Sequence, residues 1–203
     1  MRDPGIGRVL VASLHQAIAD ILPTRLTFYE NWLHAEGLRD GTIGLAPLYA
    51  VLSFLRQEGA AYGSISTRAG EYAAEWTVAS MSPIERGLIK TAPAWMRKRL
   101  AMRIVRRLVR NSYSGSRAIA KISHGNARVD VRASVFCTVR DRVDHPLCVF
   151  YLAAFSRLLT LFDFHSQAEV LACRGTGGSS CVVALALSGE ALAPTPTPEA
   201  EVA

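Results

Sequence analysis

The chain has 203 residues, of which 50% are hydrophobic and 20% are charged. This length and composition predict one globular domain and exclude a disordered or fibrous chain. Lys and Arg outnumber Asp and Glu by 23 to 17, so the net charge is +6 and acidic partners are plausible.

The first half of the chain, to about residue 112, predicts helices. Apolar residues recur there at helical spacing, in segments separated by Pro, Gly, Ser and Thr. Pro47 near the start of one segment and Gly59 after its end fit the usual places of these residues at helix ends. The expected helices cover residues 7–22, 24–37, 45–58, 66–81, a short segment from residue 82, and 93–112.

The second half begins with a pattern that predicts a β-hairpin. Residues 117–123 and 127–139 alternate apolar with polar residues on either side of a His-Gly-Asn turn. One face of the second strand is expected to meet the core, and it would carry Val129, Val131, Ala133, Val135, Cys137 and Val139.

A buried helix and a second hairpin follow. The segment from Pro146 to Phe162 is apolar on almost every side, which predicts a central helix. Residues 169–173 and 181–187 are expected to be strands joined by a glycine-rich loop.

The predicted fold is therefore α+β, with a helical layer packed on an antiparallel sheet and a buried helix between two hairpins. We expect one domain over residues 1–188, with a helical part at 1–112 and a mixed part at 113–188. Residues 189–203 are rich in Pro, Thr, Ala and Glu and are expected to form a disordered tail.

Hydropathy predicts no membrane span, because Arg157 and Asp163 interrupt the most apolar stretch. The apolar run near the N-terminus is too short for a signal peptide, so we expect a cytoplasmic protein. In that compartment the four cysteines are expected to be thiols or metal ligands rather than disulfides.

Three of the cysteines have a spacing that predicts a metal site. Cys148, Cys173 and Cys181 follow the pattern C-x24-C-x7-C. Cys148 would lie in the first turn of the buried helix, where the helix dipole favours a thiolate. Cys173 and Cys181 would lie at the two ends of a hairpin loop, which brings them together. Three thiolates suit Zn²⁺, and we expect a structural zinc ion.

The residues around these cysteines resemble the 4-vinyl reductase domain family. The resemblance covers roughly residues 115–188 and is carried by His145-Pro146-Leu147-Cys148-Val149-Phe150-Tyr151 and by the CRGTGGSSCVV segment at residues 173–183. In that family a His-Pro-x-Cys motif opens a helix, and a Cys-x-x-x-Gly hairpin ends in a second Cys before an apolar strand. The resemblance implies helices against an antiparallel sheet, a fold shared with small subunits of the TRAPP vesicle-tethering complex.

The resemblance also bears on the fourth zinc ligand. Related sensor domains use three Cys and one Glu placed three residues before the hairpin Cys, but that position here is Val170. Glu169 is one residue out of register, so the candidates are Glu169, His165, Cys137 and water. Of these, Cys137 is expected to be a small buried hydrophobe, because it lies on the apolar face of a strand.

The family includes proteins of bacteriochlorophyll biosynthesis and sensor domains that bind phenols and similar aromatics. Because the sequence shows no motif for a hydride donor, we expect a non-enzymatic protein that binds a tetrapyrrole intermediate, as a carrier or biosynthesis accessory. The alternatives are a 4-vinyl reductase acting on a divinyl chlorophyllide, an aromatic-ligand sensor and a TRAPP-like scaffold. Apolar walls are expected from Phe54, Tyr72, Trp76 and Trp95, and a contact to ligand carboxylates from Arg97 or Arg99.

The helix at residues 95–110 has a basic face. On it, Arg99, Arg103, Arg106, Arg107 and Arg110 fall within an arc of about 100°. This face could meet anionic lipid, ligand carboxylates or an acidic protein, or it could be solvated surface. We expect no nucleic-acid binding, because the face lacks interleaved aromatic residues. We expect a homodimer, since sensor members of this fold commonly pair.

Overall fold

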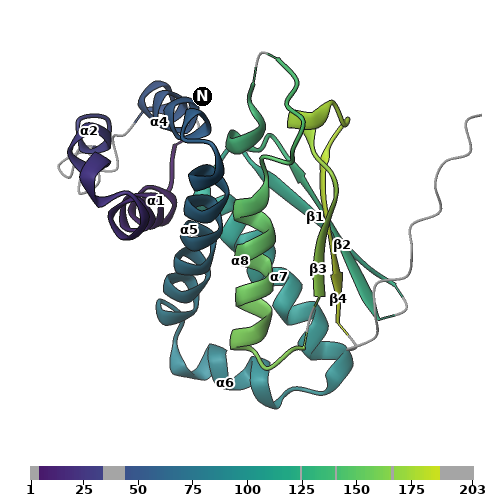
Figure 1. Ribbon diagram of the computed structural model, residues 1–203. Helices are drawn as coiled ribbons and strands as arrows, with labels where there is room; N and C mark the ends of the chain where they lie inside the picture. Colours follow the sequence, from purple (N-terminus) through teal and green to yellow (C-terminus); the bar gives the residue numbers. More distant parts are fainter. Residues whose placement is uncertain (1–4, 34–43, 124, 140, 166, 188–203) are drawn as a thin grey trace, which may run out of the picture.

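The computed structural model describes residues 5–33, 44–123, 125–139, 141–165 and 167–187. It confirms the α+β class, with helices packed on one face of a four-stranded antiparallel sheet (Figure 1). The predicted tail at residues 189–203 lies outside the described residues. Among the helices that are described, none has the length and apolar character needed to cross a membrane.

The elements fall into three layers. The first half contains α1 (Arg8–Ile21), the 3-10 turn η1 (Pro23–Arg25), α2 (Leu26–Glu30), α4 (Leu45–Gln57), α5 (Ala60–Ala79), α6 (Pro83–Thr91) and α7 (Ala94–Ser112). The second half contains β1 (Arg117–Ser123), β2 (Asn126–Arg132), η2 (Val135–Cys137), α8 (Val149–Leu161), β3 (Gln167–Ala172), η3 (Arg174–Thr176) and β4 (Cys181–Ala186). In Figure 1, α1, α2 and α4 form an outer layer, while α5, α7 and α8 lie between them and the sheet.

The sheet has the strand order β1-β2-β4-β3, and each pair of neighbours is antiparallel. Val129 of β2 lies opposite Ala120 of β1 and Val183 of β4, on the face that α7 and α8 cover. On the other face, Ile119, Lys121 and Arg128 are exposed. Successive side chains along each strand therefore point alternately to a buried face and to a solvated face of the sheet.

Helices α5 and α8 form the centre of the molecule, and a glycine brings them close together. A Cβ atom at Gly70 would lie 2.3 Å from the carbonyl oxygen of Phe150, so only glycine fits at this crossing. The prediction of a buried helix in the second half is confirmed, because Phe150, Tyr151, Phe155 and Leu158 of α8 are fully buried.

Several helix boundaries differ from the sequence prediction. The helix expected over 24–37 consists of η1 and the short α2, which ends at Glu30, and residues 34–43 lie outside the described residues. The helix expected to begin at residue 66 begins at Ala60. Gly59 has a φ angle of 61°, so it turns the chain from α4 directly into α5.

The predicted strand over 127–139 is too long, because β2 ends at Arg132. Ala133 has a φ angle of 54° and is exposed rather than on the core face. The chain then enters the 3-10 turn η2, which places the Phe136 ring on Phe150 with 4.6 Å between the ring centroids. Packing of Phe136 on Phe150 therefore favours a turn at residues 135–137, although the alternating sequence pattern beyond Arg132 is typical of a strand.

Candidate metal centre

The four cysteines of the chain meet at one end of the sheet. All are buried free thiols, and their Sγ atoms lie within 4.8 Å of one another. The Sγ atoms of Cys137 and Cys173 are 3.4 Å apart, well beyond the length of a disulfide bond. In a tetrahedral site with Zn–S distances near 2.3 Å, the sulfur atoms would be about 3.8 Å apart. The cluster could therefore hold a metal ion.

The fourth member of the cluster is Cys137, one of the candidates for the fourth ligand, although the alternating sequence pattern predicts a small buried hydrophobe on a strand at this position. It is instead the last residue of η2, and the turn at Ala133 brings it to the other three cysteines. The Ser116 hydroxyl donates to the carbonyl oxygen of Ala133 at 2.7 Å, and an Arg56 guanidinium N–H donates to that of Phe136 at 3.3 Å. These two bonds fix the backbone on either side of the turn.

Cys148 is the N-cap residue of α8, which begins at Val149 and not at Pro146, so Cys148 directly precedes the first turn in which it was predicted. Its neighbour Leu147 makes two hydrogen bonds that hold this segment. The carbonyl oxygen of Leu147 accepts from the buried Tyr62 hydroxyl at 2.9 Å, and its N–H donates to Cys173 Sγ at 3.4 Å. An N–H aimed at sulfur stabilises the thiolate form that a metal ligand needs.

Cys173 and Cys181 lie at the two ends of the loop between β3 and β4, as predicted. The loop turns back at Gly177, which has a φ angle of 96°. The N–H of Gly178 then donates to the carbonyl oxygen of Cys173 at 2.9 Å, and Thr176 Oγ1 donates to the same oxygen at 3.0 Å. These hydrogen bonds hold the loop in a tight turn, and both of its cysteine thiols belong to the same cluster.

The four thiols shift one another's pKa values because they lie close together in a small buried space. The pKa of Cys173 is lowered by hydrogen bonds from the thiols of Cys137, Cys148 and Cys181, with a smaller effect from the N–H of Leu147. The pKa of Cys148 is raised by hydrogen bonding to the same neighbours and by burial. Four thiolates at this spacing repel one another, and a divalent cation would offset that repulsion.

The other candidates for a fourth ligand lie apart from this cluster. Glu169 and His165 are both exposed, whereas the four cysteines are buried. The sequence signal that could have selected Cys137 is its place in the same half of the chain as the other three cysteines, since all four lie between residues 137 and 181.

The residues predicted to contact a ligand lie at three separate places. Tyr72 and Trp76 stack on α5 with 5.3 Å between their ring centroids, and the Tyr72 hydroxyl donates to Asp20 of α1. Phe54 of α4 packs against Phe28 and Trp32. The Arg99 guanidinium lies 5.4 Å from the ring centroid of the exposed Trp95, and Arg97 donates to the carbonyl oxygen of Phe162.

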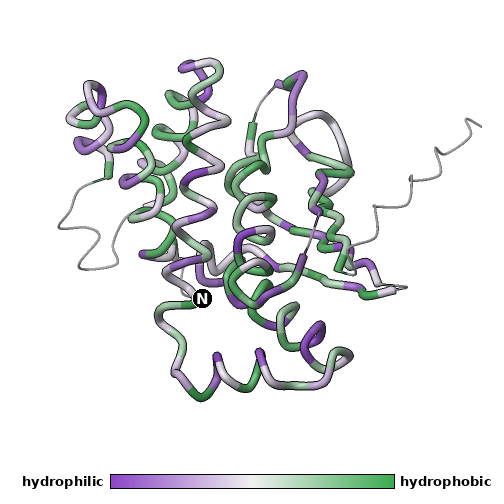
Figure 2. The backbone as a smooth tube through the Cα atoms, turned by 60° about the horizontal axis from the view of Figure 1, so that its bottom comes forward, coloured by the Kyte–Doolittle hydropathy of each residue, from purple (hydrophilic) through white to green (hydrophobic). Residues whose placement is uncertain are grey.

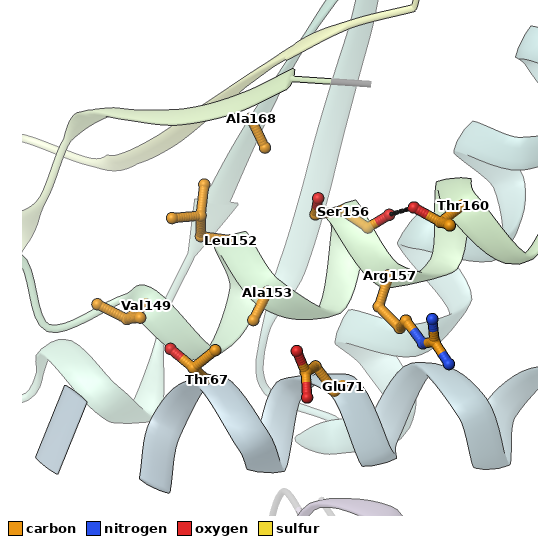
Figure 3. A pocket seen from close by; sticks show the side chains of 9 residues that line it. All are labelled: Thr67, Glu71, Val149, Leu152, Ala153, Ser156, Arg157, Thr160 and Ala168. Carbon is orange, nitrogen blue, oxygen red and sulfur yellow. Dashed lines mark hydrogen bonds between the residues drawn. The ribbon is translucent and has the colours of Figure 1, made fainter. Parts of the chain in front are cut away.

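A groove of about 360 Å³ lies between α5, α8 and the edge strand β3 (Figure 3). Val149, Leu152 and Ala153 form its apolar part, and Glu71 and Arg157 lie toward its polar end. None of the aromatic residues predicted to contact a ligand lines this groove.

Comparison of the chain with models of known protein families gives no match, and comparison with curated proteins gives none either.

Proposed function

We propose that the four cysteines bind one zinc ion with a structural role. The observation that carries this proposal is the burial of all four thiols with their sulfur atoms within 4.8 Å. Zn²⁺ favours four soft sulfur ligands in a tetrahedral arrangement. With Cys137 as the fourth ligand, no position is left open for water or substrate, which is typical of structural rather than catalytic zinc.

The zinc ion would tie together three segments that are far apart in the sequence. Cys137 belongs to the turn after β2, Cys148 to the start of α8, and Cys173 and Cys181 to the second hairpin. Because zinc binding adds to the folding free energy, its loss should loosen this end of the sheet.

Metal analysis of purified protein tests the zinc site, with an expected content of about one zinc ion per chain. Cys137→Ala and Cys173→Ala should each lower the zinc content and the melting temperature. Val135→Ala is the matched control, since it truncates a buried side chain of the same η2 turn without removing a donor atom. Zinc-free parent protein, or equal zinc loss in the control, would contradict the proposal.

We further propose that the protein is a non-enzymatic carrier or biosynthesis accessory for a tetrapyrrole. The resemblance to the 4-vinyl reductase domain family supports this ligand class, and the groove between α5, α8 and β3 supplies a place for it. Its volume of about 360 Å³ is near the lower end of the range for small-molecule sites, so it would hold one edge of a macrocycle. Arg157 lies at the polar end, where its guanidinium pairs with Glu75 at 2.7 Å, and its remaining N–H groups would donate to a propionate carboxylate.

Titration with protoporphyrin, followed by absorbance, tests the groove. Ser156→Trp places a large ring among the residues that line it and should weaken binding at least about tenfold. Ser53→Trp is the matched control, because Ser53 is exposed on α4. Equal affinity in all three proteins would exclude the groove, and turnover of a divinyl chlorophyllide with a nicotinamide would replace the carrier function with the reductase.

A further inference from the structure

We propose that helices α6 and α7 form a surface that binds anionic lipid bilayers. This inference is independent of the zinc and tetrapyrrole proposals, because it concerns residues outside the cysteine cluster and the groove. The α6–α7 surface consists of Ile84, Leu88, Trp95, Arg99, Arg103, Arg106 and Arg110.

The positive charge of the chain is concentrated in these two helices. Residues 83–112 contain nine Lys or Arg residues and one acidic residue, Glu85, so their net charge is +8. The whole chain has a net charge of only +6, so the rest of it has a net charge of −2. A field this uneven would orient the protein toward a negatively charged surface.

Within the part of the chain that the structure describes, three arginines of the surface have no carboxylate partner, whereas Arg106 donates to the carbonyl oxygen of Ala120 in β1 at 2.9 Å. Arg107 pairs with Glu85 at 3.0 Å, which holds α6 beside α7. In contrast, Arg99, Arg103 and Arg110 are exposed and have no carboxylate within 4.0 Å among the described residues. At 100° per residue these arginines and Arg106 continue the helix face on which Trp95 lies.

Three large apolar side chains are exposed on the same two helices. The exposed fraction is 84% for Ile84, 54% for Leu88 and 61% for Trp95. Ile84 and Leu88 are one helical turn apart on α6, about 100–140° around the helix from the buried Ile89. The tube in Figure 2 alternates between hydrophobic and hydrophilic residues along α6, and Figure 1 places this helix at one end of the molecule.

This arrangement fits a bilayer better than a protein partner. The apolar side chains are exposed on two helices and do not line the groove beside α8. They also do not line a second hollow, which lies on the outer face of the sheet around Ile119 and Arg128. A protein interface needs matching pockets for such side chains, whereas a bilayer accepts them directly. Trp95 would lie at the level of the headgroups, Ile84 and Leu88 at the acyl boundary, and the arginines at the lipid phosphates.

Cosedimentation of the purified full-length protein with vesicles tests the proposal. Binding is expected to phosphatidylcholine vesicles that contain roughly 30 mol% phosphatidylglycerol at low salt, and not to phosphatidylcholine alone. Each arginine contributes about fivefold, so Arg99→Gln/Arg103→Gln/Arg110→Gln should weaken binding on the order of 100-fold. Ile84→Gln/Leu88→Gln should weaken it about tenfold.

Two control variants match these changes at other sites. Arg117→Gln/Lys121→Gln/Arg128→Gln removes the same charge from the outer face of the sheet. Ile119→Thr/Ile122→Thr removes two exposed apolar side chains from β1. Both controls should bind nearly as well as the parent. A control that loses as much binding as its α6–α7 counterpart would show diffuse attraction and overturn the proposal.

Tryptophan fluorescence locates the contact. The Trp32→Phe/Trp76→Phe protein retains Trp95 alone, since the chain has three tryptophans. Its emission should shift to shorter wavelength with anionic vesicles, and brominated lipid should quench it. Absence of vesicle binding at low salt, or binding without a shift, would overturn the proposal, as would capture of an acidic protein by a surface that ignores vesicles.

Discussion

The Tyr62 hydroxyl, buried in α5, donates a hydrogen bond to the carbonyl oxygen of Leu147, 2.9 Å away and one residue before Cys148. Burial raises the pKa of Tyr62, so the hydroxyl stays protonated and remains a donor across the physiological range. Through Leu147, whose N–H points at Cys173, this bond connects the central helix to the cysteine cluster.

Removal of this hydroxyl should weaken both the fold and the metal centre. We expect Tyr62→Phe to lower the free energy of unfolding by about 1 kcal/mol, because a buried carbonyl oxygen loses its donor. The melting temperature should fall by about 2–4 °C, and zinc should pass faster to a chelator. Tyr49→Phe removes the hydroxyl of a half-buried tyrosine in α4 and is the control. Equal zinc transfer in both variants would contradict a role for Tyr62 at the centre.

The close crossing of α5 and α8 gives a second prediction. Gly70→Ala should lower the free energy of unfolding by about 1–3 kcal/mol, because its Cβ would overlap the backbone of Phe150 and Ala154. Gly63→Ala, on the same helix with no atom within 4 Å of the added Cβ, should instead be neutral or slightly stabilising. Denaturant unfolding measures both. A Gly70→Ala protein as stable as the parent would mean that the helices can separate without cost.

The sequence predicted most of the fold because hydrophobic periodicity is strong where one face of an element is buried. The helix that became α7 and the strands β1 and β4 have the expected type and nearly the expected limits. The wrongly predicted helix and strand boundaries lie where the backbone conformation of a single residue redirects the chain. Gly59 turns α4 into α5 without a loop, and Ala133 adopts a positive φ angle that alternation does not reveal.

The candidate site was predicted in part for the same reason. The spacing of Cys148, Cys173 and Cys181 predicts a shared site. The two ends of a hairpin loop lie close together in any fold, which places Cys173 beside Cys181. Cys137 is one of four candidates for the fourth ligand, and alternation places it on the apolar face of a strand, because the sequence does not reveal the turn at Ala133 that redirects it. The aromatic residues expected to contact a ligand were chosen by type, and residue type alone does not place α4, α5 and α7 relative to one another.

Glu58 provides a prediction about pH. The pKa of Glu58 is lowered because Arg25 and Tyr29 donate hydrogen bonds to its carboxylate, which joins η1 and α2 to the end of α4. A carboxyl with a lowered pKa in the folded state stabilises the protein above its ordinary pKa of 4.5, and this contribution disappears as the pH falls through the folded-state value.

We therefore expect Glu58→Gln to lower the melting temperature by about 2–4 °C at neutral pH. The difference from the parent should shrink steadily as the pH falls below 4.5. Glu169→Gln, at an exposed position on β3 with no ion pair among the described residues, is the control for loss of one carboxylate at neutral pH. A constant difference between Glu58→Gln and the parent down to acid pH would contradict this linkage.

Chelation of the metal should loosen one end of the molecule and leave the other intact. Zinc would join η2, the start of α8 and the β3–β4 loop, whereas α1 and α5 contribute no ligand. Hydrogen exchange should therefore accelerate at residues 133–139 and 173–181 after chelation, while the buried amides of α1 and α5 stay protected. The Cys137→Ala protein should show the same local increase without chelator. Unchanged exchange at these segments would exclude a structural role for the metal, and equal acceleration throughout would mean that the whole fold depends on it.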